Sequence, residues 1–588
     1  MSMTGSPRRV APGRGAGTHE PEVVLGVAVI ALLAAIAFVM IGSVFLTGAD
    51  AALNPVTLVV DLAQGRTQWT GAMTAVAIVL TLLLLALVAT GLWLYSRRAM
   101  TRVFDRAAPL MGRGREIEFL TAKGCRKLSK MLDIPASFGP GLPVGRAVTG
   151  GRGLFSNWET CTVDVWGPRR GKTRTRIIPG ILSAPGPVLA TSNKYDHMIK
   201  ATRDYRAQCG RIWLFDLQEI AKAQPDFWWN PLSYVTDDDS AERAVSVLAV
   251  SGVPSSAGAG GGSAEFFHKA ASRLLKSLLL AAALDKLPAA VVAEWTTDHT
   301  AASDAAHILD RHGWPRLAGE VRAAVASPSD QRGGVFETAL NWASVFTMST
   351  VQEWITDPRD GRPHFEVGDF VASRDTAYVL SQGSSDGGSS AGPIASLLTV
   401  AICEAAEHLA AEQGGRLHVP LVAQLDEAGN VIRWPAMPEK YTHYGSRGIL
   451  LSAMFQSMSQ GVTAFGKEGW DTLWDAAGIA IYGGGTKTRD RLEDLSQLIG
   501  NYQYQSVSRS SGRGGGSTSR STQTERILDV AALAAIPKGR AIAFNGSAAP
   551  VVVKTTDFTL TALGKKAAAA AAAVANKVKI DLSKEPAQ

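Results

Sequence analysis

Two long apolar stretches near the amino terminus dominate the hydrophobic pattern of the chain. They cover Val23–Gly48 and Ala72–Tyr95, and neither contains a charged residue. Each is long enough to cross roughly 30 Å of hydrocarbon as an α-helix. Arginines precede the first stretch and follow the second, whereas the segment between them has more acidic than basic residues. Because basic residues favour the cytoplasmic side, this pattern predicts a two-helix transmembrane hairpin over 23–95 with both chain ends in the cytoplasm.

The first apolar stretch has one alternative interpretation, a cleaved signal peptide. It is longer than such a signal, and no small-residue cleavage site with a mature start follows it. We therefore expect residues 1–22 to be a cytoplasmic tail and 23–95 to be a membrane anchor. The chain from about residue 100 onward is expected to form a large cytoplasmic body.

Beyond the anchor, short apolar runs alternate with helical patterns and turn signals. Buried runs of this kind are typical of an α/β fold with a parallel, doubly wound sheet, here over 100–235 and 353–560. Residues 100–155 are expected to be a basic, glycine-rich lead-in to it. The predicted strands lie in CTVDVW (161–166), PVLAT (187–191), RIWLFD (211–216), TAYVLS (376–381), VPLVAQLDE (419–427), GILLSAMFQS (448–457), GIAIYGG (478–484) and RAIAFNG (540–546).

Other segments lack this strand pattern. Helical periodicity without strand signals predicts an all-helical insertion over 236–352, with a flexible glycine-serine stretch at 251–265. A second low-complexity tract, 506–522, has almost no apolar residue and is expected to stay mobile, either as a spacer or as a basic contact to DNA. The tail 561–588 is rich in alanine and lysine and predicts a surface helix or a frayed end.

Composition adds little that is specific. The chain has 588 residues, of which 46% are hydrophobic and 19% charged, with a net charge of +7. This excess suits anionic partners such as nucleic acid or a membrane surface. No two of the four cysteines form a Cys-x-x-Cys pair, which disfavours a zinc knuckle or a disulfide framework.

The segment WGPRRGKT, residues 166–173, is similar to a phosphate-binding loop between a strand and a helix. In such a loop backbone N–H groups surround the phosphates of a nucleotide at a helix N-terminus. Lys172 would reach the β- and γ-phosphates, and Thr173 would ligate Mg²⁺. One position departs from the motif, because Trp166 stands where its first glycine belongs. The residues assigned to nucleotide binding are Gly167, Arg170, Gly171, Lys172, Thr173 and Arg174.

Acidic and amide side chains follow two other predicted strands. Asp426 and Glu427 end one apolar run, where buried carboxylates need a cation to face. We expect Asp426 to hold Mg²⁺ through its water shell and Glu427 to activate the attacking water. Gln456 ends the next run and would contact the γ-phosphate or that water, although a polar residue is also ordinary at a strand end. The alternative for the two carboxylates is a solvated acidic turn.

Taken together, these segments resemble type IV secretion coupling proteins, the TraG/TraD-like conjugative DNA-transfer ATPases. The resemblance extends over nearly the whole chain and rests on four segments: the loop with its broken helix and the lysine-containing turn at Lys194, the Asn-Pro-Leu at 230–232, the LDEAGN at 425–430, and GSRGILLSAMFQSMSQG at 445–461. The N-terminal hairpin and helical insertion are also in the order of that family. Ser192 departs from it, standing where an aspartate is common.

The resemblance implies a RecA-like nucleoside triphosphatase domain that uses ATP and Mg²⁺ and assembles as a hexamer in the bacterial inner membrane. Arg447 would then be an arginine finger for the neighbouring subunit. The implied partners are DNA, single-stranded and carried with a relaxase, and the components of a type IV secretion channel. Two alternatives remain at this point: an FtsK-like double-stranded DNA translocase, and a membrane receptor that does not hydrolyse ATP because Trp166 impairs the loop.

Overall fold

The computed structural model describes residues 21–195, 197–252, 262–382, 391–512, 515–546 and 548–582. The chain divides into two compact units, Met1–Arg106 with Asn501–Arg526, and Ala107–Gly500 with Ile527–Gln588. The predicted tail 1–22 and the glycine-serine stretch 251–265 lie largely outside the described residues.

Two antiparallel helices of the first unit occupy the region predicted to be a hairpin. Helix α1 is Pro21–Thr47, and helix α3, Gly71–Asp105, continues well beyond the second apolar stretch. Residues Gly71–Thr90 have the length and composition of a membrane span, and few of their side chains are buried. An exposed apolar surface of this extent is typical of a site that contacts a membrane or a protein partner. Many aliphatic side chains of the two helices are more than half exposed, among them Leu33, Leu46, Leu82, Leu83, Leu85 and Leu87.

The segment between the two spans contains a further element, helix α2, which is Pro55–Ala63. Asn54 caps it by accepting a hydrogen bond from the Val56 amide. Its residue Leu58 is buried against Val44 and Met73 of the flanking helices. The connection is therefore an ordered helical turn.

Strands β3 to β9 of the second unit form the predicted parallel sheet. Its strand order is β9-β3-β8-β7-β4-β6-β5, and every neighbouring pair is parallel. Every residue of these seven strands is buried except Ile212, the first residue of β5. Such burial is expected for strands that are covered on both faces. The strands are β3 (Thr162–Val165), β4 (Val188–Ser192), β5 (Ile212–Asp216), β6 (Thr376–Leu380), β7 (Leu421–Leu425), β8 (Ile449–Phe455) and β9 (Ile479–Tyr482).

The sheet does not end at β9, and here two expectations were wrong. Strand β12 (Arg540–Asn545) pairs with β9 in antiparallel orientation, so the last predicted run is not part of the parallel set. Residues 100–155 also hold strands β1 (Leu142–Ala147) and β2 (Gly153–Ser156). Together with β13 (Ala548–Lys554) they extend the sheet to eleven strands. Strands β1 and β2 alternate buried and partly exposed positions, so they lack the continuous apolar runs by which the parallel strands were recognised. In β13 only Val551–Val553 are buried.

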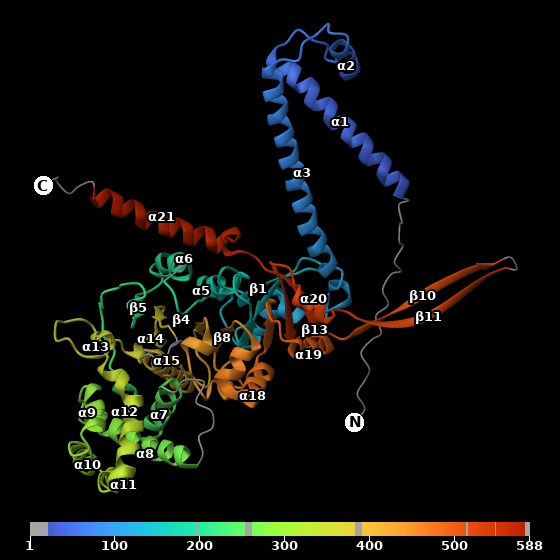
Figure 1. The fold of residues 1–588 in the computed structure, drawn as a ribbon. Coiled ribbons are helices and arrows are strands. Elements are labelled where there is room, and N and C mark those ends of the chain that lie inside the picture. The colour runs from blue at the N-terminus through green and yellow to red at the C-terminus, as the bar shows by residue number, and fades with distance from the viewer. Residues whose placement is uncertain are drawn as a thin grey trace. The chain divides into compact units, whose positions relative to one another are not determined.

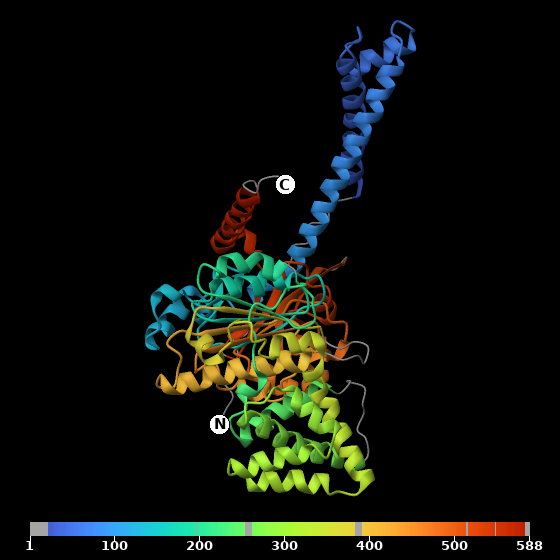
Figure 2. The ribbon, with the colours of Figure 1, turned by 90° about the vertical axis from the view of Figure 1, so that its left-hand side faces the viewer.

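Helices cover both faces of the sheet, and the views in Figure 1 and Figure 2 show them as separate layers. Helices α5 (Ile178–Ser183) and α6 (His197–Arg206) lie on one face. Helices α15 (Gly392–Glu412) and α18 (Met458–Ala476) lie on the other. Helix α15 is long and apolar enough to resemble a membrane span, but most of it is buried in this core.

The predicted helical insertion is a bundle at one end of the second unit (Figure 2). Among the described residues between β5 and β6 there is no strand. The α-helices there are α7 (Asp238–Gly252), α8 (Gly262–Leu284), α9 (Ala290–Thr297), α10 (Ala302–Arg311), α11 (Pro315–Val325), α12 (Ser329–Ala343), α13 (Ser349–Ile355) and α14 (Val367–Ala372).

The structure gives regular secondary structure to both low-complexity segments. The described residues of the tract 506–522, which was expected to stay mobile, belong to a two-stranded hairpin of β10 (Asn501–Gly512) with β11 (Gly515–Arg526). Alternating serine, threonine and glutamine suit a strand exposed on both faces, a pattern that resembles a mobile linker in sequence. The alanine-rich tail forms the predicted surface helix, α21 (Ala562–Leu582), and most of its described side chains are exposed. Its Ala567 is buried in the same core cluster as residues of α5 and α6, so one side of the helix is packed.

Candidate nucleotide site

A cavity of about 380 Å³ opens where the parallel strands β3, β4, β7 and β8 end. In open α/β sheets this edge is where ligands bind, because loops from neighbouring strands converge there. The volume lies in the range of small-molecule sites. Its lining residues are Trp166, Gly167, Pro168, Arg169, Arg170, Gly171, Lys172, Thr173, Arg174, Asn193, Lys194, His197, Asp426, Glu427, Gln456 and Lys538.

The phosphate-type loop joins β3 to a helical turn of unusual width. Residues Thr173–Ile177 form a π-helical turn, in which the Ile178 amide donates to the Thr173 carbonyl. Pro179 follows and has no N–H to donate, so the ordinary helical bond to Thr175 is missing at this point. Gly171 has φ of 95°, a conformation that favours glycine, and its carbonyl accepts hydrogen bonds from the amide and hydroxyl of Thr175.

Lys172 meets both predicted carboxylates in this cavity. Its Nζ lies 2.7 Å from Asp426 Oδ1 and 3.2 Å from Glu427 Oε1. The three side chains are each about one-tenth exposed. Burial acts to lower the pKa of Lys172, but the two carboxylates outweigh it and raise that pKa above its ordinary value, so the ammonium stays charged. The sequence had placed these residues more than 250 positions apart, and the sheet brings them together.

Gln456 completes the group. Its Nε2 donates to Glu427 at 2.6 and 2.7 Å from the two carboxylate oxygens. Glu427 has φ of 55°, an uncommon value for a residue with a side chain, and such backbone strain clusters at functional sites. The side chain that sequence reasoning assigned to water activation is therefore held from two sides by Lys172 and Gln456.

Trp166 does not obstruct the cavity. The ring is buried in the core, and a Cβ added to Gly483 would lie 2.0 Å from it, so only glycine fits opposite. The next residue, Gly167, donates its amide to the Gly484 carbonyl at 2.8 Å. Gly485 also approaches so closely that a Cβ on Gly167 would lie 2.7 Å from its Cα. The glycine that the motif lacks at its first position is thus present one residue later, packed against a second glycine segment.

The two arginines assigned to nucleotide binding line the cavity but have protein partners. Arg170 Nη1 donates to the Ile536 carbonyl at 2.7 Å. Arg174 forms a two-point ion pair with Asp557, with Nε 2.6 Å from Oδ2 and Nη2 3.1 Å from Oδ1. Sequence reasoning assigned no site role to Lys194 or Lys538, which bring further positive charge to the cavity. Lys538 comes from a distant loop that carries no motif.

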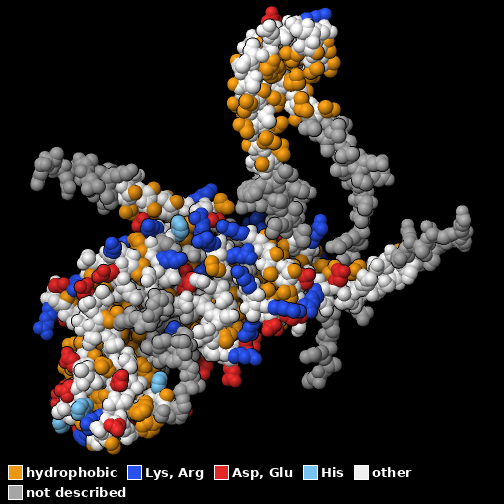
Figure 3. All heavy atoms as spheres, in the orientation of Figure 1, with side chains coloured by type: hydrophobic (Ala, Val, Ile, Leu, Met, Phe, Trp, Pro, Cys, Tyr) orange, Lys and Arg blue, Asp and Glu red, His pale blue; other side chains and the backbone are white. Residues whose placement is uncertain are grey.

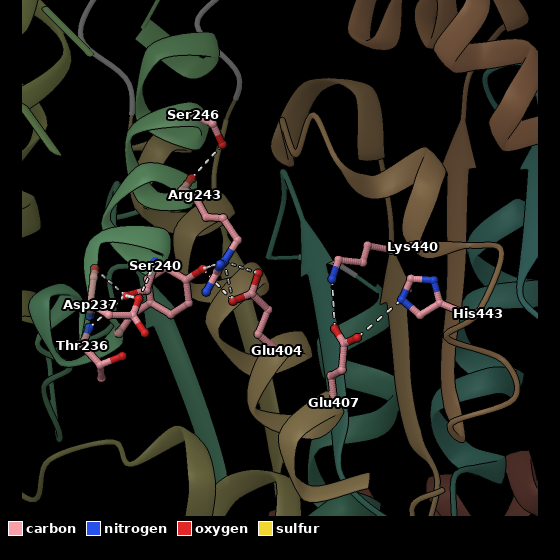
Figure 4. A network of polar contacts seen from close by, with 10 residues as sticks. Thr236, Asp237, Ser240, Arg243, Ser246, Glu404, Glu407, Lys440 and His443 are labelled. Carbon is pink, nitrogen blue, oxygen red and sulfur yellow. Dashed lines mark hydrogen bonds and ion pairs between the residues drawn. The ribbon is translucent and has the colours of Figure 1, made fainter. Parts of the chain in front are cut away.

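Arg447 lies outside this cavity, on the turn before β8. Its Nη1 is paired with Glu407 of α15, which also binds Lys440 at 2.9 Å. Burial acts to raise the Glu407 pKa, but Lys440, Arg447 and His443 outweigh it and hold that pKa below its ordinary value. One turn earlier, Glu404 binds Arg243 of the helical insertion (Figure 4). In a single chain Arg447 therefore makes no contact with the Lys172 group.

The donors present fit a nucleoside triphosphate with Mg²⁺. Cations surround the cavity, and Figure 3 shows Lys and Arg side chains gathered over the region of α5 and α6. The Thr173 hydroxyl and the Asp426 carboxylate line the same space. No cluster of three His, Cys, Asp or Glu side chains suited to a metal occurs among the described residues. One hydroxyl and one carboxylate, as supplied by Thr173 and Asp426, are typical of Mg²⁺ sites that are completed by phosphate oxygens and water.

Comparison with known proteins gives one match in sequence and several in structure. Residues 420–538 match the family model described as the TraM recognition site of TraD and TraG. No curated protein matches the chain in sequence. Plasmid coupling protein TrwB in complex with ADP and Mg²⁺ is 16% identical, with a TM-score of 0.47, over 68% of this chain and 85% of that one. VirB4 of Thermoanaerobacter pseudethanolicus is 10% identical, with a TM-score of 0.39, over 71% and 96%.

At such TM-scores and identities, these structures say nothing about ligands or activity of this chain. The family model carries more weight, because it includes Asp426, Glu427 and Gln456. It also includes Arg447 and the loop of Lys538. Residues 420–538 are therefore similar to this domain of TraD and TraG.

Proposed function

We propose that this protein is a membrane-anchored ATPase coupling protein that recruits a DNA or nucleoprotein substrate and drives it into a type IV secretion channel. The observation that carries the proposal is the convergence of Lys172, Asp426, Glu427 and Gln456 at the end of the phosphate-type loop. Three of these residues, Asp426, Glu427 and Gln456, lie in the region that matches the TraD and TraG family model, which supplies the biological context.

The chemistry follows from what these groups can do. A bound nucleoside triphosphate with Mg²⁺ supplies the phosphoanhydride bond that is cleaved. Lys172 and the loop amides would hold the phosphates, and Thr173 and Asp426 would hold the metal ion. Glu427 would take a proton from water while Gln456 keeps its carboxylate in place. Lys172 must exchange its two carboxylate partners for phosphate, so binding breaks the ion pairs present in the chain alone.

The membrane and partner parts of the proposal rest on other observations. Helices α1 and α3 supply apolar surface, and the arginines flanking the two stretches favour cytoplasmic chain ends. The family description points to partners of the DNA-transfer machinery, and we propose DNA with its relaxase as the substrate. A homo-hexameric ring would place Arg447 at the nucleotide of the neighbouring subunit, which is consistent with its position outside its own cavity.

Two alternative functions can be distinguished from the proposed one. An FtsK-like translocase would act on double-stranded DNA, and the match to a TraD and TraG domain disfavours it. A receptor without hydrolysis was suggested by Trp166, and the placement of that ring in the core weakens this suggestion.

The decisive experiment measures ATP hydrolysis by the full-length protein in detergent or lipid nanodiscs. We expect Mg²⁺-dependent turnover that single-stranded DNA stimulates more than double-stranded DNA does. The Lys172→Met variant is the negative control, and Lys194→Met, which removes an exposed cation from the same cavity lining, is the matched one. Nucleotide binding without any turnover would favour the receptor. Stimulation by double-stranded DNA alone would favour the translocase.

A further inference from the structure

A buried carboxylate, Asp164, lies directly before the phosphate-type loop and has no part in the chemistry above. It is the third residue of β3 and is fully buried. A buried carboxylate is costly unless it is paired and hydrogen-bonded. It does not line the cavity. Its partners must therefore explain its presence.

Those partners stand at the two ends of the loop. Trp166, at the start, donates its indole N–H to Asp164 Oδ2 at 3.1 Å. Arg176, after the loop and on its π-helical turn, donates Nε to the same oxygen at 2.7 Å and Nη2 to Oδ1 at 3.3 Å. One carboxylate thus bridges the residue before the loop and the helical turn after it.

Arg176 extends this bridge to the neighbouring sheet. It is 3% exposed, and its Nη1 donates to the Pro143 carbonyl of β1. Nη2 also lies 3.5 Å from the Thr162 hydroxyl. A planar guanidinium with fixed donors orients its partners more strongly than a flexible ammonium does. The turn that carries Thr173 is therefore fastened to β1 and β3 at once.

Neighbouring side chains on the same turn serve other contacts. Arg174 binds Asp557, and the Thr175 hydroxyl bonds the Gly171 carbonyl. The Asp164 cluster is thus separate from the Lys172 group in its contacts. It also gives a physical reason for Trp166, because a glycine at that position has no side-chain donor for Asp164.

We propose that Asp164 is a positioning residue, holding Trp166 and Arg176 so that the phosphate loop is in its binding shape before nucleotide arrives. The proposal rests on the proposed nucleotide site. A loop that is already ordered loses less conformational freedom on binding, which increases affinity. We call the hydrogen bonds of Asp164 with Trp166 and Arg176 the clip. Loss of the clip should raise the Kd of nucleotide even in a variant whose overall fold stays intact.

The test compares two tryptophan variants of the full-length protein in detergent. Trp166→Phe keeps an aromatic ring and removes the donor to Asp164. Trp158→Phe is the matched control, because Trp158 is equally buried and its indole donates to the Gly139 carbonyl at 3.1 Å, away from the loop. Fluorescent ADP with Mg²⁺ is the binding probe. We expect Trp166→Phe to raise the Kd about threefold to tenfold and Trp158→Phe to leave it unchanged.

Hydrogen exchange in the absence of nucleotide supplies a second measurement. Peptides covering 166–176 should exchange faster in Trp166→Phe than in the wild type, and at the wild-type rate in Trp158→Phe. Equal effects of the two variants on both measurements would overturn the proposal. If Trp166→Phe does not fold, Arg176→Lys, which keeps the buried charges balanced, takes its place with the same expectations.

If neither variant folds, exchange of the wild-type loop decides: protected amides support a preformed loop, and unprotected ones refute it. A wild-type protein that fails to bind ADP would refute the proposed function instead. The exchange comparison would still test the clip.

Discussion

Replacing Lys172 by methionine separates two roles that the structure gives this side chain. In the chain alone its ammonium neutralises Asp426 and Glu427, and in the proposed function it also holds phosphate. Methionine has similar length and no charge. The change should therefore both destabilise the nucleotide-free protein and weaken nucleotide binding.

The stability effect can be sized from burial. Removing one partner of a buried ion pair costs about 3–5 kcal/mol, and the lower end applies because these side chains still border an open cavity. Unfolding entropy is near 2.1 cal/mol/K per residue, so a unit of roughly 450 residues loses about 3 °C in Tm for 3 kcal/mol. Loss of a charged phosphate contact weakens binding by about 1.5–3 kcal/mol, or roughly tenfold to a hundredfold in Kd.

Differential scanning fluorimetry without nucleotide, and titration with fluorescent ADP and Mg²⁺, measure the two effects on the full-length protein. Lys194→Met is the matched control, since Lys194 lines the cavity and is exposed. We expect it to change Tm by less than about 1 °C, as surface substitutions do. Nucleotide-free Tm values that agree for the wild type and Lys172→Met would show that the ion pairs contribute nothing. An unchanged Kd would refute the assignment of the loop.

Three further predictions follow from the same geometry. Glu427→Gln should bind ATP but hydrolyse it about 10²- to 10⁴-fold more slowly, because an amide cannot accept the proton from water; equal turnover in a steady-state phosphate-release assay would exclude a general-base role. Arg447→Ala should lower ATPase activity without changing the Kd of nucleotide, and mixing it with Lys172→Met subunits should restore part of that activity if it acts across a subunit boundary. Lys440→Ala, which removes another cation from Glu407, is its control, and equal losses in both variants would make Arg447 merely structural. The tract 506–522 contains three arginines, Arg509, Arg513 and Arg520. Changing all three to serine should weaken DNA binding at all sequences and flatten its salt dependence, while ATP binding stays the same. An unaltered salt dependence of DNA binding would identify the hairpin as a spacer.

Local sequence was sufficient for the parallel sheet and for the membrane-type helices. Strands buried on both faces need continuous apolar runs, and such runs stand out from any background. Because parallel strands place their carboxyl ends on one edge, the ends of β3, β7 and β8 had to bring Lys172, Asp426 and Gln456 near one another. The predicted core of the site therefore followed from strand ends alone.

Tertiary structure decided what depends on contacts between distant segments. Strands β1 and β2 could be identified only through their partners, since half-buried antiparallel strands carry a weaker apolar signal. No local sequence pattern predicts the pairing of Arg447 with Glu407, or of Asp164 with Trp166 and Arg176. The sequence around a charged residue does not show whether its side chain is solvated or buried. Lys538 reaches the cavity from a loop after α20 (Val530–Ala534), where only the antiparallel end of the sheet brings it close. The spacing of apolar residues determines helices and strands, whereas the partner of a buried charge depends on which distant elements pack against each other in the folded chain.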